Sequence, residues 1–124
     1  MPQGLKAVVV EDDPDIQYLY KLKLEREGFV VVTADDGIQG LKVIEEFQPH
    51  IVLLDLMMPI MNGSEMLARM RSEPWGSDAR VIVLTNISKD EAPQVLRFLS
   101  VDRYIVKAHH TPAQVVAVVR EVLG

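Results

Sequence analysis

Residues 51–63 read Ile-Val-Leu-Leu-Asp-Leu-Met-Met-Pro-Ile-Met-Asn-Gly, which is four apolar residues followed by a single carboxylate. A short run that is apolar at every position is typical of a parallel strand covered by helices on both sides. A carboxylate at the end of such a strand is costly to hold unless it is paired or coordinated. The stretch therefore predicts a buried strand over residues 51–54 that ends in a functional Asp55.

Similar short runs recur along the chain and alternate with longer stretches whose apolar residues lie three and four apart. This alternation of strands with amphipathic helices is typical of α/β proteins. The predicted strands are Leu5–Val10, Phe29–Thr33, Ile51–Leu54, Val81–Leu84 and Tyr104–Val106. The helical stripes are Ile16, Leu19, Tyr20 and Leu24; Ile38, Leu41 and Ile44; Met66, Leu67 and Met70; Ala92, Val95, Leu96 and Leu99; and Val115, Val118, Val119 and Val122.

Five strand-helix units within 124 residues predict a single domain over residues 1–124. The fold class is α/β, a (βα)5 flavodoxin-like doubly wound sandwich around a five-stranded parallel sheet. Right-handed crossovers leave few strand arrangements, and one common order is 2-1-3-4-5. In that order, ligands bind beyond the carboxyl ends of the first and third strands.

Local signals predict where the helices begin and end. Asp13 before Pro14 is typical of a helix N-cap, and Gly28 is typical of a left-handed helix stop. Thr111 and Gln114 fit a capping box at the start of the last helix. The fourth helix is expected to start near Asp90, because Pro93 fits only within a first turn.

The charge distribution excludes several classes of function. The chain carries 18 acidic and 13 basic side chains, a formal net charge of −5 at pH 7, so direct nucleic-acid binding and attachment to an anionic membrane are not expected. Eleven of the acids but five of the bases fall within residues 1–62. The chain has no cysteine, which excludes disulfides and thiolate metal sites. No segment is typical of a signal peptide or membrane span, so we expect a cytoplasmic protein.

Polar side chains stand at the predicted carboxyl ends of four strands. They are Glu11 and Asp12 after the first strand, Asp55 after the third, Thr85 after the fourth and Lys107 after the fifth. Three carboxylates and one ammonium give this cleft a net charge of −2, and the carboxylates repel one another unless one is protonated or a cation neutralises them. Oxygen ligands favour Mg2+, and a carboxylate beside Mg2+ and a lysine is suited to accept a phosphoryl group as an aspartyl phosphate.

Taken together, these motifs resemble the receiver domains of two-component response regulators over essentially the whole chain. The resemblance rests on Val10-Glu11-Asp12-Asp13, on Leu53-Leu54-Asp55-Leu56-Met57-Met58-Pro59 with Gly63, on Leu84-Thr85-Asn86 and on Tyr104-Ile105-Val106-Lys107. It implies a phosphorylation-dependent signalling switch rather than an enzyme, a protein that catalyses only its own phosphorylation and dephosphorylation.

The resemblance also implies a role for each site residue. Asp55 corresponds to the phosphoacceptor, Asp12 to a direct Mg2+ ligand and Glu11 to a partner of the metal-bound waters. The backbone carbonyl of Met57 corresponds to a further ligand, and Lys107 to the ammonium that pairs with the phosphoryl group.

Two further residues correspond to the switch. Thr85 matches the hydroxyl that reaches the phosphoryl group, and Tyr104 the aromatic side chain that changes rotamer on activation. In such domains a sensor histidine kinase donates the phosphoryl group. The fourth helix, fifth strand and last helix then form the face that meets an effector protein or effector domain. A monomer or a phosphorylation-dependent dimer is expected.

This chain departs from the family pattern at two places. Lys107 is followed by Ala108 where the family has proline, often after a cis bond, and we expect a cis bond here also, although it costs about 2.5–4 kcal/mol without proline. The usual Gly-Ala pair before the fifth strand is replaced by Ser100-Val101, on the switching face. In such domains the side chains two residues after the phosphoacceptor and after the threonine influence water access. The resemblance therefore implies slow hydrolysis of the aspartyl phosphate here, because these residues are the apolar Met57 and Ile87.

Two alternatives remain open at this point. One is a receiver-like interaction module that no longer uses phosphate. The other is a Mg2+-dependent aspartyl-phosphate phosphatase of the haloacid dehalogenase type, which needs a second Asp at position 57, where this chain has Met. A dinucleotide-binding fold is excluded, because no glycine-rich turn follows the first strand.

Overall fold

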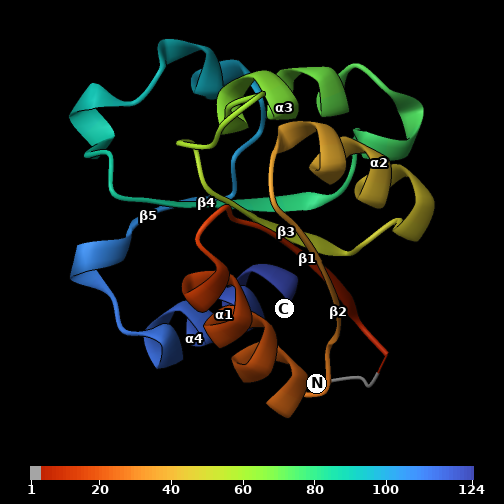
Figure 1. Ribbon diagram of the computed structural model, residues 1–124, viewed down its shortest axis with the longest axis vertical. Coiled ribbons are helices and arrows are strands. Elements are labelled where there is room, and N and C mark those ends of the chain that lie inside the picture. The colour runs from red at the N-terminus through yellow and green to blue at the C-terminus, as the bar shows by residue number, and fades with distance from the viewer. Residues whose placement is uncertain (1–3) are drawn as a thin grey trace.

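The fold is a parallel sheet between two layers of helices, as a computed structural model describes it for residues 4–124. The five strands lie in the order β2-β1-β3-β4-β5 (Figure 1), which confirms the predicted fold class and strand order. The strands are β1 Lys6–Val10, β2 Val30–Ala34, β3 Ile51–Leu54, β4 Arg80–Thr85 and β5 Arg103–Val106. The α-helices are α1 Pro14–Arg26, α2 Gly37–Phe47, α3 Gly63–Arg71 and α4 Pro112–Leu123.

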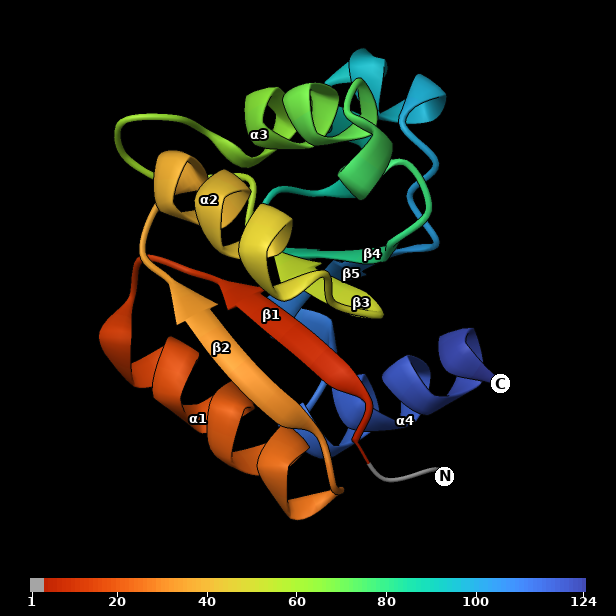
Figure 2. The same cartoon turned by 90° about the vertical axis from the view of Figure 1, so that its right-hand side faces the viewer.

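Each face of the sheet is covered by its own pair of helices. Helices α1 and α4 lie on one side, and α2 and α3 lie on the other (Figures 1 and 2). Successive strand residues point to opposite faces. Val9 and Leu53 therefore pack with α1 and α4, whereas Val10 and Leu54 pack with α2 and α3. This two-sided burial explains why the strands are apolar at nearly every position.

The predicted boundaries agree with the structure to within one residue at most strand ends, and the predicted caps are present. The Asp13 side chain accepts hydrogen bonds from the amides of Asp15 and Ile16 at the start of α1. Gly28 has a φ of +93°, a value that favours glycine. Thr111 and Gln114 form the capping box at the start of α4. Asp13 is thus held by capping.

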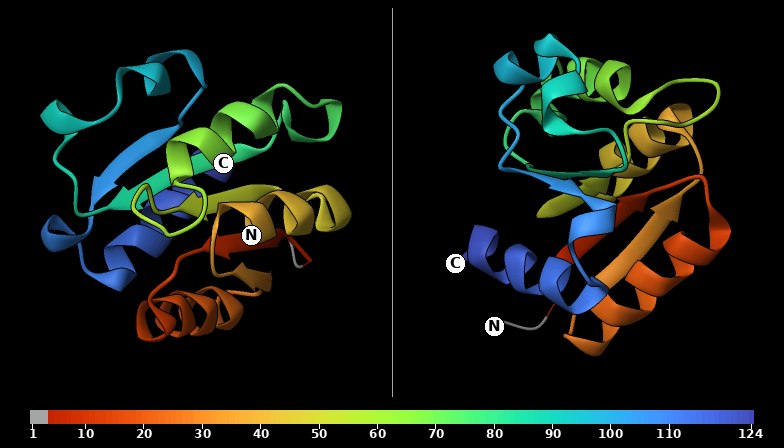
Figure 3. Two further views of the ribbon diagram at one scale, coloured as in Figure 1. Left: turned by 45° about the horizontal axis from the view of Figure 1, so that its top comes forward. Right: turned by 90° about the vertical axis from the view of Figure 1, so that its left-hand side faces the viewer.

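The predicted fourth helix is wrong. Between β4 and β5 the chain forms two short 3-10 turns, η2 Lys89–Glu91 and η3 Gln94–Phe98, in place of one α-helix (Figure 3). The break falls at Pro93, which has no amide hydrogen to donate and disfavours the helical conformation of the preceding residue. Ala92 accordingly has a ψ of 145° and Pro93 a ψ of 131°, both extended. Three residues of the predicted stripe still pack inward, since Leu96 is buried and Ala92 and Leu99 pack against the same cluster, but Val95 is exposed.

One arginine anchors the end of this irregular segment. The guanidinium of Arg71, in the last turn of α3, donates hydrogen bonds to five backbone carbonyls. Those of Leu99 and Ser100, at 2.8 and 2.9 Å, lie after η3. The others belong to Gly76, Ser77 and Ala79. Ser100 has a φ of +56°, a conformation that few residues other than glycine adopt. The hydrogen bonds of Arg71 therefore stabilise the chain around Ser100, where the backbone conformation is unfavourable.

Replacing Arg71 with Met is expected to lower the free energy of unfolding by about 2 kcal/mol or more, because several partly buried carbonyls lose a charged donor. Urea unfolding followed by circular dichroism measures the change. Arg69→Met is the matched control, since Arg69 lies on the same helix and only approaches the exposed Glu65, at 3.6 Å. Equal stability losses in the two variants would show that the Arg71 hydrogen bonds do not stabilise the fold.

Candidate functional site

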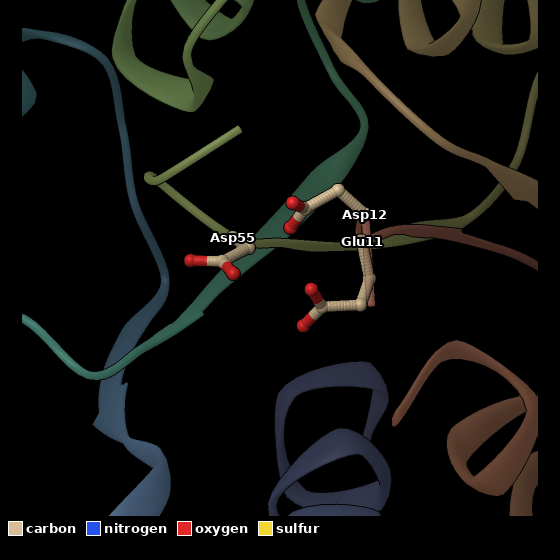
Figure 4. A group of neighbouring side chains, drawn as sticks. All are labelled: Glu11, Asp12 and Asp55. Atoms are coloured by element: carbon tan, nitrogen blue, oxygen red, sulfur yellow. The ribbon is translucent and has the colours of Figure 1, made fainter. Parts of the chain in front are cut away.

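The candidate site lies where the carboxyl ends of β1 and β3 meet. These strands are neighbours, and Val10 pairs with Leu54 in the register of the sheet. The residues that follow them are therefore brought together, although they lie more than forty positions apart in the sequence. Glu11, Asp12 and Asp55 each offer a carboxylate oxygen, and these oxygens lie within 4.8 Å of one another (Figure 4). The predicted carboxylate cluster is confirmed.

Lys107 reaches this cluster from the end of β5. Its Nζ donates a hydrogen bond to Asp55 Oδ2 at 3.0 Å and another to Glu11 Oε1. All three side chains are largely buried. The Lys107–Ala108 peptide is trans, so the expected cis bond is wrong. The costly cis form is unnecessary, because the lysine of a trans loop already contacts both carboxylates.

Burial and pairing oppose each other at this ion pair. Burial alone would lower the pKa of Lys107, but its hydrogen bonds to Glu11 and Asp55 outweigh that effect and raise the pKa. Burial raises the pKa of Glu11, although the hydrogen bonds from Lys107 and from the Asp13 amide act in the opposite direction. The ammonium thus stays charged at neutral pH and offsets part of the negative charge of the cluster.

Tyr20 of α1 lies in the core close to this pair, and burial raises the pKa of its phenol above 10. Above pH 10 the unfolded chain ionises this tyrosine more readily than the folded protein does, so stability falls as the pH rises. Tyr20→Phe is expected to make the free energy of unfolding less steeply dependent on pH above pH 10. Denaturant unfolding at several pH values measures the slope, with exposed Tyr18→Phe as the control. Equal slopes in both variants would contradict the assignment.

The loop after β3 holds Asp55 in place. The amide of Met57 donates a hydrogen bond to Asp55 Oδ1 at 3.1 Å, so both carboxylate oxygens are engaged. A Cβ atom at Gly63 would collide with the backbone carbonyl of Asp55, which explains the glycine at this position. The role of the Met57 carbonyl as a metal ligand remains a prediction.

The predicted switch residues both contact the loop after β4. Thr85 is fully buried at the end of β4, and its Oγ1 lies 3.4 Å from the amide of Ile87. The hydroxyl of Tyr104 in β5 donates a hydrogen bond to the carbonyl of Ile87 at 2.7 Å. One loop residue therefore bridges Thr85 and Tyr104, which gives a physical route between the site and the edge of the sheet.

Gln17 of α1 was not predicted from the sequence, but its side chain forms hydrogen bonds beside the site. Its side-chain amide donates hydrogen bonds to the carbonyls of Glu11 and Ala34 and to the Asp35 carboxylate, at 2.8–3.1 Å. This contact joins the ends of β1 and β2. A weak signal was present, because Gln17 lies one helical turn after the Asp13 cap and is positioned to face the strand ends.

The donor set fits a hard divalent cation. Its three carboxylates supply oxygen ligands, and Asp12 is exposed, so it lies at the open side of the cluster. Magnesium uses one or two carboxylates and retains several waters, whereas zinc prefers nitrogen and sulfur ligands. The residues present therefore suit Mg2+ together with the oxygens of a phosphoryl group.

Comparison with known proteins agrees with this arrangement. The family described as response regulator receiver domain matches residues 7–120. The DNA-binding response regulator MtrA of Mycolicibacterium smegmatis is 35% identical over 116 residues, which are 93% of this chain and 49% of that protein. An uncharacterized 14.6 kDa protein of Leptolyngbya boryana is 32% identical over 103 residues, 83% of this chain and 79% of that protein.

A solved structure is similar over nearly the whole chain. The response regulator TrrA of Thermotoga maritima, crystallised in complex with Mg2+ and BeF, has a TM-score of 0.83 and 29% identity, and the match covers 95% of this chain and 98% of that one. The fold and site thus define a signalling domain of two-component systems rather than a member of a classical enzyme family. The chain belongs to the response regulator receiver domains.

Two further observations concern the length of the chain relative to its relatives and the hydrophobicity of its helices. The chain spans 38–49% of several curated regulators that it matches, including MtrA, although it spans 79% of the Leptolyngbya protein. Within residues 4–124, none of the helices has the length and apolar character needed to cross a membrane.

Proposed function

We propose that residues 1–124 form a receiver domain that accepts a phosphoryl group on Asp55 from a sensor histidine kinase and signals through a changed surface. The observation that carries this proposal is the contact of Lys107 with Asp55 beside the carboxylates of Glu11 and Asp12. A buried nucleophilic carboxylate, a paired ammonium and two further carboxylates able to hold Mg2+ are the parts that phosphoryl transfer to Asp requires.

In the proposed transfer, one Asp55 carboxylate oxygen forms a bond to phosphorus while the bond from phosphorus to the donor nitrogen breaks. The electron pair of the broken bond stays on the imidazole nitrogen, which takes a proton from solvent, so the donor histidine leaves neutral. Bound Mg2+, held by Asp12, Asp55 and the Met57 carbonyl with Glu11 on its waters, would neutralise charge on the phosphoryl oxygens. Lys107 loses one carboxylate partner as Asp55 becomes an acyl phosphate, and it then pairs with the phosphoryl group.

Thr85 and Tyr104 are proposed to convey this change to the partner surface. When the Thr85 hydroxyl turns toward the phosphoryl group, its contact with the Ile87 amide is lost and the β4 loop is free to shift. The Tyr104 hydroxyl is held by the same loop, so its environment changes as well. We place effector binding on η2, η3, β5 and α4, and we expect a cytoplasmic monomer or a phosphorylation-dependent dimer.

Of the two alternatives, the phosphatase is not supported, because the family match is to receivers and Met57 replaces the required Asp. The interaction module without phosphate lacks a supporting observation, since the acidic cluster and Lys107 are assembled. Direct DNA binding is not proposed for these residues. In MtrA, which is roughly twice as long, DNA binding belongs to the whole protein.

The proposal is tested by incubating the protein with phosphoramidate and measuring its intact mass. A phosphoryl adduct is expected with Mg2+ and not with a chelator, and Asp12→Asn is expected to raise the Mg2+ concentration required. Asp15→Asn, one turn away in the exposed start of α1, is the control. An adduct that forms equally with chelator present would contradict the proposed role of the carboxylate cluster.

A further inference from the structure

The loop between β3 and α3 presents apolar side chains to solvent beside the candidate site. Met57 is 64% exposed and Ile60 is 77% exposed. The loop projects beyond the ends of α2 and α3 (Figure 2). Burying a large apolar side chain completely contributes roughly 1.5–3 kcal/mol to stability. Met57 and Ile60 forgo most of this contribution, because both are largely exposed.

The backbone of Ile60 adds a second cost. Its φ is +70°, in the left-handed region. A β-branched side chain is unfavourable there, and glycine or asparagine is normally found instead. A residue that is apolar, exposed and conformationally unfavourable has no stabilising role visible in the fold. Such an outlier beside a reactive site points to a contact with another molecule.

The same surface borders the route to Asp55. A cleft of about 470 Å³ has a mixed lining in which apolar side chains predominate. It is lined by Asp12, by Leu56, Met57, Met58 and Pro59 of the loop after β3, by the polar Asn62 and Ser64, and by Ile87 and Pro93. Among the described residues that line this cleft, Asp12 is the one ionisable side chain. Asp55 itself is only 7% exposed, and Leu56 and Met57, the two residues that follow it, line this cleft.

We propose that an apolar rim is the docking surface for a protein donor whose phosphohistidine is flanked by apolar side chains. The rim consists of the cleft residues Met57, Met58, Pro59, Ile87 and Pro93 together with exposed Ile60, the next residue of the same loop. The inference rests on the proposed phosphorylation of Asp55. The inference adds the chemical character of the partner. A donor with leucine-like side chains on either side of the phosphohistidine would bury Met57 and Ile60 on docking, whereas a donor with polar side chains there would leave both exposed to water. Methionine side chains suit such a surface, because they adapt to different shapes.

The test uses two synthetic phosphohistidine peptides that differ only in their flanks, leucine in one and serine in the other. We expect wild-type protein to take the phosphoryl group from the leucine peptide with a kcat/KM about tenfold higher or more, as burial of roughly one side chain provides. Ile60→Thr, and Ile60→Asn, which suits the left-handed backbone, are expected to reduce that ratio by at least half. Val30→Thr, at the opposite end of the sheet and also exposed, is expected to retain it.

Phosphoramidate separates this inference from the proposed function. It carries no flanking side chains that could be buried against the rim, so the Ile60 and Val30 variants are expected to react with it at the wild-type rate. If wild type gains no phosphoryl group from phosphoramidate, the proposed function fails. If it does but treats both peptides alike, the docking inference alone is overturned. It is also overturned if Ile60→Thr instead abolishes self-association in sedimentation, because the rim would then bind a second copy of the chain.

Discussion

Replacing Lys107 with Met is expected to lower the free energy of unfolding by about 3 kcal/mol at pH 7 in magnesium-free buffer. The lysine ammonium is the cation that contacts the buried carboxylates of Glu11 and Asp55. Removing one partner of a buried ion pair leaves uncompensated charge, which costs more than the intact pair contributes. In this case two carboxylates lose their partner at once.

Magnesium gives this prediction a second readout. Millimolar Mg2+ is expected to restore part of the stability of Lys107→Met, because a divalent cation neutralises the same carboxylates and binds the folded state. Urea unfolding with and without Mg2+ measures both effects. Lys89→Met, at an exposed lysine of η2, is the control. A loss below about 1 kcal/mol, or no response to Mg2+, would contradict the electrostatic account of the site.

The double substitution Met57→Asn and Ile87→Glu is expected to shorten the lifetime of the aspartyl phosphate about tenfold, as a polar group that positions or deprotonates water does. In wild type both side chains line the cleft beside Asp55 and are apolar, so they offer water no hydrogen-bonding partner there. Intact mass recorded over time after removal of the phosphodonor measures the lifetime. Met57→Leu with Ile87→Val is the apolar control. A lifetime unchanged in the double variant would defeat the prediction of slow hydrolysis.

The strands and the site were predictable because burial and topology leave few choices. Five apolar runs place Glu11, Asp55 and Lys107 at strand ends, and the right-handed order brings those ends to one edge. The distances among these three side chains follow from the register of neighbouring strands. The alternation of side chains between the two faces of the sheet leaves little freedom in that register. The roles of the residues came from resemblance, since an Asp at a strand end does not by itself specify phosphoryl transfer.

The region between β4 and β5 was not predictable from periodicity. The apolar stripe there is helical in spacing, but the conformation depends on a competition between that stripe and Pro93. Two of the five carbonyl contacts of Arg71, those with Leu99 and Ser100, join segments nearly thirty residues apart and stabilise the end of the irregular path. An arginine on a helix surface gives no sign of such partners in the sequence. The trans peptide bond after Lys107 was not predicted for a similar reason. Whether the Lys107 side chain can contact Asp55 from a trans loop depends on the tertiary structure, which the sequence pattern does not show.

The central claim is that Asp55 is the residue that carries the phosphoryl group. Intact mass after incubation with Mg2+ and phosphoramidate tests it most directly when wild type is compared with Asp55→Asn, which keeps the shape of the side chain and removes the nucleophilic oxygen. We predict one phosphoryl adduct on wild type and none on Asp55→Asn. An adduct on Asp55→Asn as large as that on wild type, or no adduct on wild type, would contradict the account.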